Sequence, residues 1–110
     1  MLTRKTAIQI IKDFIKACAD RNITFNKVIL FGSVANGDNR KYSDIDVAFV
    51  SDKFTDNPFE NWHALSPIII KDSRFTDIET HTFTTKDFEE GDPFIEEIKK
   101  TGIEIDLKKL

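Results

Sequence analysis

The chain has 110 residues, of which 40% are hydrophobic and 32% are charged. These proportions are typical of a soluble globular protein and exclude a disordered tail, and the length suits one compact domain over residues 1–110. Because no apolar run is long enough to cross a bilayer and residues 1–5 lead into no signal peptide, we expect a cytoplasmic protein without a membrane partner.

The charge and the metal-binding residue types narrow the function classes further. The net charge of -3 argues against a nucleic-acid partner, because such binding depends on a basic surface that neutralises phosphates. Cys18 is the only cysteine, which excludes an internal disulfide, and its place among apolar residues predicts a buried and inert thiol. With only His63 and His81 besides, the chain lacks the usual ligand set of a zinc site.

The first half of the chain predicts a helix, a strand, a loop and a second strand. A helix from a Thr3 cap to about Asp20 is indicated by apolar residues that recur on one helical face: Ala7, Ile8, Ile11, Phe14, Ile15 and Cys18. Residues 27–31 are apolar and β-branched and end at Gly32, which predicts a buried strand followed by a tight turn. The polar residues 36–43 then predict a loop, and residues 44–50 a neighbouring strand.

A second helix is expected after Asn57, which is a suitable cap with Pro58 at the first helical position. We expect this helix to run to about Leu65 and to be broken or restarted at Pro67. Trp62 and the apolar patch at residues 68–70 are interpreted as core, because a small sheet needs helices to cover it.

The last part of the chain predicts a third strand at residues 77–83. Its alternation places Ile78, Thr80 and Thr82 on one face, and on the other Asp77, Glu79, His81 and Phe83. Asp92 and Pro93 then indicate a helix that ends at Gly102, and residues 103–107 add a short extended segment. The pattern as a whole predicts an α/β fold with a small mixed sheet flanked by helices.

Two residue pairs that can bind a substrate or a metal ion lie on either side of the predicted loop. Gly32 and Ser33 follow the first strand, and the backbone N–H groups and hydroxyl of such a turn can hold phosphate oxygens. After ten further residues come Asp44 and Asp46, whose spacing on a strand directs both carboxylates to one face, where they can share magnesium ions. The joint spacing therefore predicts a cleft for a metal-loaded triphosphate.

A pair of metal ions that assists in-line phosphoryl displacement normally needs a third carboxylate. The third strand offers Asp77 and Glu79 on one face, and we choose Glu79 because its position deeper in the strand fixes its orientation better. Asp77 is the reserve. The alternatives for Glu79 are solvent exposure or an ion pair with Arg74. His81 shares the face but is interpreted as a surface histidine without a role.

The segment F-G-S-V-A-N-G-D-N-R-K-Y-S-D-I-D-V-A-F-V at residues 31–50 resembles the signature of the DNA polymerase beta superfamily. The short chain is similar to that superfamily's minimal nucleotidyltransferases, the MNT proteins, and its order of expected helices and strands agrees with theirs over nearly the whole length. It departs from the family at Asn36, before Gly37, where arginine is common. Arg40 and Lys41 in the same loop are candidates to supply the missing cation.

The resemblance implies a nucleotidyltransferase fold like the polymerase beta palm and a set of residue roles. Gly32 and Ser33 would bind a nucleoside triphosphate such as ATP. Asp44, Asp46 and Glu79 would be the catalytic acids and would hold magnesium, with two ions expected. The implied reaction moves AMP to an acceptor hydroxyl. Because such proteins commonly pair with a HEPN protein as the antitoxin to its toxin, a tyrosine of a HEPN toxin is the acceptor that the resemblance suggests.

Two rival hypotheses stay open at this point. The chain is an MNT-type antitoxin or regulatory subunit that acts by binding, with little or no catalysis, or it transfers a nucleotide to a small molecule such as an aminoglycoside. The intact signature favours the enzyme over the binding protein, and the short chain leaves little room to bind a small acceptor.

Overall fold

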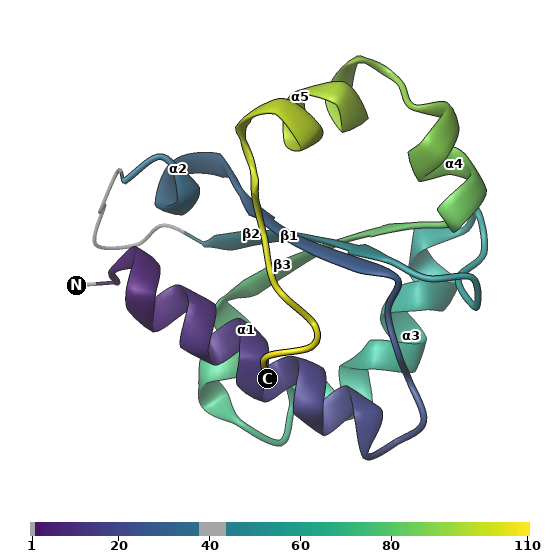
Figure 1. The fold of residues 1–110 in the computed structure, drawn as a ribbon. Coiled ribbons are helices and arrows are strands. Elements are labelled where there is room, and N and C mark those ends of the chain that lie inside the picture. Colours follow the sequence, from purple (N-terminus) through teal and green to yellow (C-terminus); the bar gives the residue numbers. More distant parts are fainter. Residues whose placement is uncertain (1, 38–43) are drawn as a thin grey trace.

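The computed structural model describes residues 2–37 and 44–110 (Figure 1). The helices and strands follow the chain in this order: α1 (Arg4–Ala19), β1 (Lys27–Phe31), α2 (Gly32–Ala35), β2 (Ile45–Val50), α3 (Pro58–Ile69), the 3-10 helix η1 (Ser73–Asp77), β3 (Ile78–Phe83), α4 (Thr85–Glu90), α5 (Pro93–Thr101) and β4 (Ile103–Glu104). The predicted α/β class is confirmed. No helix within the described ranges is long and apolar enough to cross a membrane.

The described residues contain one mixed sheet of four strands in the order β3-β2-β1-β4. β1 pairs antiparallel with β2 and with β4, whereas β2 and β3 pair in parallel through the crossover that contains α3. The register places Phe31 at the end of β1 opposite Asp46, and Asp46 opposite Glu79 on β3. The end of β1 and the starts of β2 and β3 therefore meet at one edge of the sheet.

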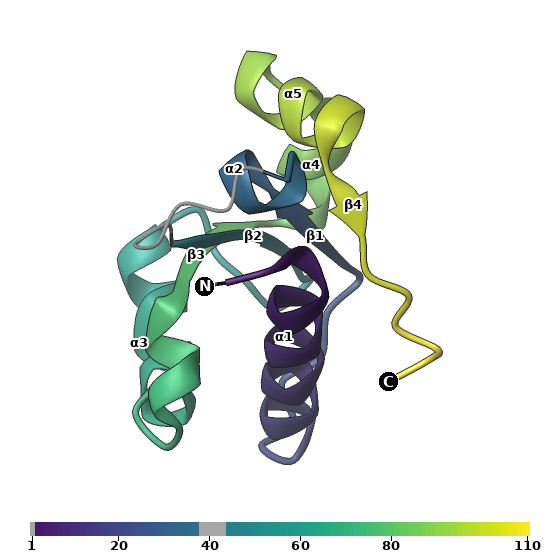
Figure 2. The same cartoon turned by 90° about the vertical axis from the view of Figure 1, so that its left-hand side faces the viewer.

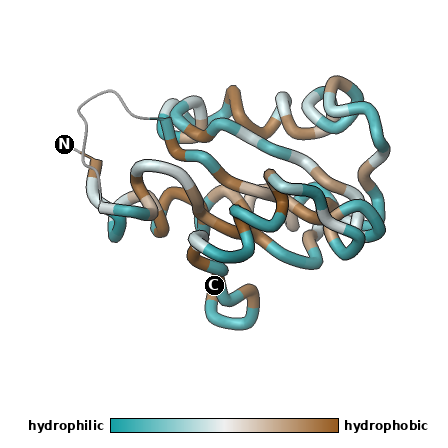
Figure 3. The backbone as a smooth tube through the Cα atoms, turned by 90° about the horizontal axis from the view of Figure 1, so that it is seen from above, coloured by the Kyte–Doolittle hydropathy of each residue, from teal (hydrophilic) through white to brown (hydrophobic). Residues whose placement is uncertain are grey.

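Helices cover the sheet on both faces. α1 and α3 lie against one face, and α4 and α5 lie across the other, as Figures 1 and 2 both show. Phe14 of α1 is fully buried and packs edge-on against Phe49 of β2 and Phe75 of η1, with ring centroids 5.5 and 5.2 Å apart. Apolar residues recur between hydrophilic ones along the helices in Figure 3. This amphipathic pattern is what lets each helix bury one face on the sheet.

The layer formed by α4 and α5 covers part of the second face. Phe88 of α4 with Ile95 and Ile98 of α5 forms one buried cluster with residues of β1 and β2: Ile29, Phe31, Ala48 and Val50. Since alternate residues of a strand share a face, Asp46 lies on the same face as Ala48 and Val50. This is the face on which the predicted site must lie. α4 itself was not predicted from the sequence.

The predicted helix starts are confirmed by their capping hydrogen bonds. The Thr3 hydroxyl accepts from the Thr6 N–H at 3.1 Å, the Asn57 side chain accepts from the Phe59 N–H at 3.0 Å, and the Asp92 carboxylate accepts from the Ile95 N–H at 2.8 Å. Each bond satisfies a backbone donor that the first helical turn leaves without a partner. Cys18 is fully buried as predicted, and burial raises the pKa of its thiol to about 12.

The prediction that α3 breaks at Pro67 was wrong, because the helix continues to Ile69. Proline has no N–H to donate to the carbonyl of His63, but the Ser66 hydroxyl donates to that carbonyl at 3.3 Å. Leu65 and Ile68, on either side of the proline, are both buried in the main core. Their packing holds the helix together across the missing backbone bond.

The interpretation of Trp62 as core was also wrong, because its side chain is 47% exposed on α3. Within the apolar patch at residues 68–70, Ile68 is buried and Ile69 is partly buried, but Ile70 is 79% exposed. Phe59, one turn before Trp62, is 64% exposed. Phe59, Trp62 and Ile70 therefore leave apolar surface on the outer side of α3.

Candidate active site

The Gly32 turn lies directly against Asp46. Gly32 follows Phe31, the residue paired with Asp46, and has a φ of +77°, a left-handed conformation that favours glycine. A Cβ atom added at Gly32 would overlap the carboxylate of Asp46. The glycine therefore allows the turn and the acid to approach closely, as the predicted cleft requires.

Ser33 occupies the first turn of α2 and is half-buried. α2 starts at Gly32, so the backbone N–H groups of this short helix begin where β1 ends, beside the start of β2. N–H groups in the first turn of a helix have no intrahelical acceptor and attract anions. The turn that contains Gly32 and Ser33 thus begins next to Asp46, with donors suited to phosphate oxygens.

Asp46 and Glu79 form an acidic pair across two parallel strands. They are register partners on β2 and β3, so their side chains project from the same face of the sheet. The pKa of the Glu79 carboxyl is raised, first by a side-chain hydrogen bond with Asp46, then by partial burial, and then by the negative charge of Asp46. The two carboxylates therefore repel each other, and a bound cation would reduce this repulsion.

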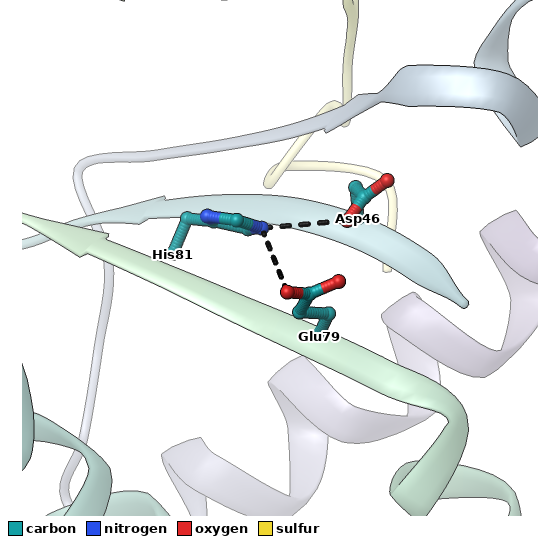
Figure 4. A group of neighbouring side chains, drawn as sticks. All are labelled: Asp46, Glu79 and His81. Carbon is teal, nitrogen blue, oxygen red and sulfur yellow. Dashed lines mark hydrogen bonds and ion pairs between the residues drawn. The ribbon is translucent and has the colours of Figure 1, made fainter.

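His81 completes a three-residue cluster with Asp46 and Glu79 (Figure 4). Its Nε2 atom lies 3.4 Å from Oδ1 of Asp46 and 4.0 Å from Oε1 of Glu79. Among the described residues, these three side chains offer ligand atoms that all lie within 4.8 Å of one another. The sequence interpretation missed His81, although its spacing of two residues from Glu79 placed both on one strand face.

Asp44 is placed differently from the prediction. β2 begins at Ile45, so Asp44 precedes the strand and is exposed, and it does not belong to the close cluster. Residues before a strand are not bound by its alternation, so the spacing of Asp44 and Asp46 does not by itself direct both carboxylates to one face. Asp44 is still near enough for its negative charge to raise the pKa of Glu79.

The structure also places Asp77 and Arg74, two residues that the sequence analysis considered together with Glu79. Asp77, the reserve for the third carboxylate, ends η1 and does not lie on β3. Arg74 does not pair with Glu79, because it forms ion pairs with Asp13 at 2.9 Å and Asp72 at 2.7 Å. Glu79 therefore remains the acid of β3 beside Asp46. Arg40 and Lys41 lie outside the described residues.

An open hollow of about 220 Å³ lies beside the cluster. It is lined by His81, by neighbouring residues of β3, by Pro58 and by Phe94 of α5. Phe94 is 47% exposed, and its ring lies 5.8 Å from that of His81, which in turn lies 4.9 Å from that of Phe31. His81 thus connects the acidic pair to an aromatic surface that is open to solvent.

The repulsion between the carboxylates of Asp46 and Glu79 gives a first prediction about stability. We expect Glu79→Gln to raise the unfolding free energy of the metal-free protein by at most about 1 kcal/mol, because it removes one of two like charges in register. The gain is small because the Glu79 side chain is 55% exposed and solvent screens it. Thermal unfolding in a chelator at pH 7 measures this change, with the exposed Glu90→Gln as the control.

The pH dependence follows from the raised pKa of Glu79. Below its ordinary pKa of 4.5 the carboxyl is protonated in the folded and the unfolded chain, so the gain from Glu79→Gln should vanish there. As the pH rises through the higher folded pKa, the wild type loses stability and the gain should appear. If the stability difference between Glu79→Gln and the wild type is the same at acidic and neutral pH, repulsion between Asp46 and Glu79 is not its cause.

The structure resembles a Sulfolobus solfataricus protein that has been assigned as a nucleotidyltransferase. The TM-score is 0.67 at 19% sequence identity, and the match covers 96% of this chain and 86% of that chain. At this identity the likeness shows the fold alone. The curated proteins contain no match to the sequence.

The sequence itself matches a family model described as a nucleotidyltransferase domain, over residues 11–108. This match spans β1 to β4 and includes the Gly32 turn and all the acids discussed above. Membership of such a family implies a nucleoside triphosphate substrate and a divalent metal ion. The chain belongs to the nucleotidyltransferase domain family.

Proposed function

We propose that this chain is a magnesium-dependent nucleotidyltransferase that moves a nucleoside monophosphate, AMP in the first place, from a nucleoside triphosphate to an acceptor hydroxyl. The proposal rests on one observation, the register that sets Phe31 opposite Asp46 and Asp46 opposite Glu79. This register brings the turn at Gly32 and two carboxylates from separate strands to one edge of the sheet.

The donor set fits a hard divalent cation. Asp46 and Glu79 offer carboxylate oxygens, which magnesium prefers, and their mutual repulsion favours a positive charge between them. Asp44, whose charge also acts on Glu79, would contribute a further carboxylate, and two ions are expected. Magnesium, when bound, supplies positive charge that stabilises the attacking and leaving oxygens of the displacement.

The residues of the chain bind and orient the substrate for this reaction. The backbone N–H groups at Gly32 and the hydroxyl of Ser33 would hold the triphosphate oxygens. The acceptor oxygen attacks the α-phosphorus in line, the bond to the β-phosphate oxygen breaks, and pyrophosphate leaves. Glu79, as the acid nearest the nucleophile, would assist the removal of the acceptor's proton.

We further propose a protein hydroxyl as the acceptor, in accord with the resemblance to minimal nucleotidyltransferases. A tyrosine of a HEPN toxin is the specific candidate, with the chain acting as the antitoxin. The apolar side chains that α3 leaves exposed, Phe59, Trp62 and Ile70, offer surface for contact with such a protein. The rival is an antitoxin that neutralises its partner by contact alone.

Labelled ATP tests the proposal directly. The protein, magnesium and the product of the adjacent gene are incubated with ATP labelled at the α-phosphate and, in parallel, at the γ-phosphate. Nucleotidyl transfer should place only the α-label on the partner, because the γ-phosphate leaves with pyrophosphate. Parallel reactions with α-labelled GTP, CTP and UTP measure the base preference.

Each outcome separates the hypotheses. Transfer of the γ-label would show phosphoryl transfer and contradict the proposal. A partner that is neutralised without any label would favour the contact model. If only a small molecule is labelled, the chain is a nucleotidyltransferase, but the proposal of a protein acceptor is wrong.

A further inference from the structure

His81 is held in place beside the acidic pair by its surroundings. Its side chain is 26% exposed, and its ring packs edge-on against Phe31 at 4.9 Å between centroids, with Phe94 at 5.8 Å. Figure 4 shows the ring with Nε2 directed toward both carboxylates. Aromatic contacts of this kind limit the rotation of the imidazole, so the direction of Nε2 is built into the fold.

Nε2 of His81 and Oδ1 of Asp46 form a long hydrogen bond, and their separation also suits two ligands of one ion. Nε2 lies 3.4 Å from Oδ1 of Asp46, longer than the roughly 2.7–3.2 Å of a usual N–H···O bond. Two ligands of one divalent ion, each about 2.1 Å from it, lie roughly 3 to 3.5 Å apart. Oε1 of Glu79 lies 4.0 Å from Nε2, so its half-exposed side chain would have to move by roughly 0.5 Å to share the ion.

We propose that His81 supplies a nitrogen ligand to the divalent ion held by Asp46 and Glu79, so that the site binds transition-metal ions in preference to Mg²⁺, with Mn²⁺ as the probe. Mg²⁺ favours oxygen donors, whereas an imidazole strengthens the binding of transition-metal ions, least for Mn²⁺ and more for the later members of the series. The inference rests on the proposed function only in placing a divalent ion at these acids. It changes the expected metal and gives His81 a role.

Metal binding by the full chain, without a purification tag, tests the proposal. Electron paramagnetic resonance follows free Mn²⁺ during a titration of the protein. Competition with Mg²⁺ then gives the affinity of the protein for Mg²⁺. His81→Gln should weaken Mn²⁺ binding at least about tenfold while leaving the Mg²⁺ affinity within about twofold, because glutamine still offers an oxygen. The ¹⁴N modulation of the Mn²⁺ spin echo should be present in the wild type and lost in this variant.

The chain contains a matched control, since it has two histidines in all. His63 packs edge-on against Phe59 on α3, outside the cluster. His63→Gln should leave both the Mn²⁺ affinity and the ¹⁴N modulation unchanged. Circular dichroism and thermal unfolding of each variant show whether the fold is retained.

The outcomes distinguish this inference from the proposed function. If His81→Gln weakens the binding of Mn²⁺ and Mg²⁺ equally, His81 only positions Asp46 and the inference is wrong. Unchanged Mn²⁺ binding in this variant, or no ¹⁴N modulation in the wild type, would also overturn the inference. If label transfer persists in those cases, the proposed function stands while the inference fails. If His81-dependent Mn²⁺ binding is seen without transfer from any nucleoside triphosphate, the inference stands and the proposed function fails.

Discussion

Asp46→Asn is expected to lower the rate of nucleotidyl transfer roughly 1000-fold while keeping the fold. Asp46 is in register with Phe31 on one side and with Glu79 on the other, so it connects the phosphate turn to the acidic pair. Asparagine has the same shape but no negative charge, and the loss of one preorganised charge from a transition state costs on the order of 10²–10³ in rate. The initial rate of α-label transfer at saturating metal measures the effect.

The stability of this variant provides the control. Removing a charge beside Glu79 should leave the melting temperature unchanged or raise it slightly, so a loss of activity cannot then be attributed to unfolding. Asp77→Asn, in η1, should keep the wild-type rate. If Asp46→Asn retains more than a tenth of the activity, or Asp77→Asn loses it, the acids have been assigned to the wrong positions.

The sequence predicted the parts of the site that depend on periodicity. Glycine after a β-branched run predicted the turn at Gly32, and the alternation of residues 77–83 placed Glu79 and His81 on one face. Both expectations depend only on local geometry, which a short segment determines by itself. The pairing of Asp46 with Glu79 is different, because the register between β2 and β3 depends on how their buried faces pack.

Where tertiary contacts decide the outcome, the sequence interpretation failed. α3 continues through Pro67 because Leu65 and Ile68 are buried around it and the Ser66 hydroxyl reaches the His63 carbonyl. Trp62 resembles a core residue by type, but its direction from the helix leaves it half-exposed. Residue type and spacing do not reveal which side of a helix the sheet will cover.

His81 was missed for a related reason. Its chemistry depends on a neighbour 35 positions earlier in the chain, Asp46, and a lone histidine on a strand carries no sign of that neighbour. The useful signal was the shared parity of Glu79 and His81, which becomes informative only once the parallel pairing of β2 and β3 is known. Sites built across strands are therefore harder to predict than turns built within one segment.

Gly32→Ala is expected to lower nucleotidyl transfer on the order of 100-fold and to destabilise the fold by about 1–3 kcal/mol. Alanine at a φ of +77° is strained by roughly 1–2 kcal/mol, and its methyl group would overlap the Asp46 carboxylate. Either the carboxylate or the turn must move, and a displacement of about 1 Å in a catalytic group can cost 10²-fold in rate. Label transfer and thermal unfolding measure the two effects.

Gly91→Ala separates backbone strain from damage to the site. Gly91 has the same φ of +77°, and a Cβ atom there would also meet a carboxylate oxygen, that of Glu96. Glu96 is 64% exposed and can move aside, and neither residue belongs to the acidic cluster. Gly91→Ala should therefore lose a comparable amount of stability but keep its activity and metal affinity. If both variants lose activity in proportion to stability, the close approach of Gly32 to Asp46 has no specific role in the reaction.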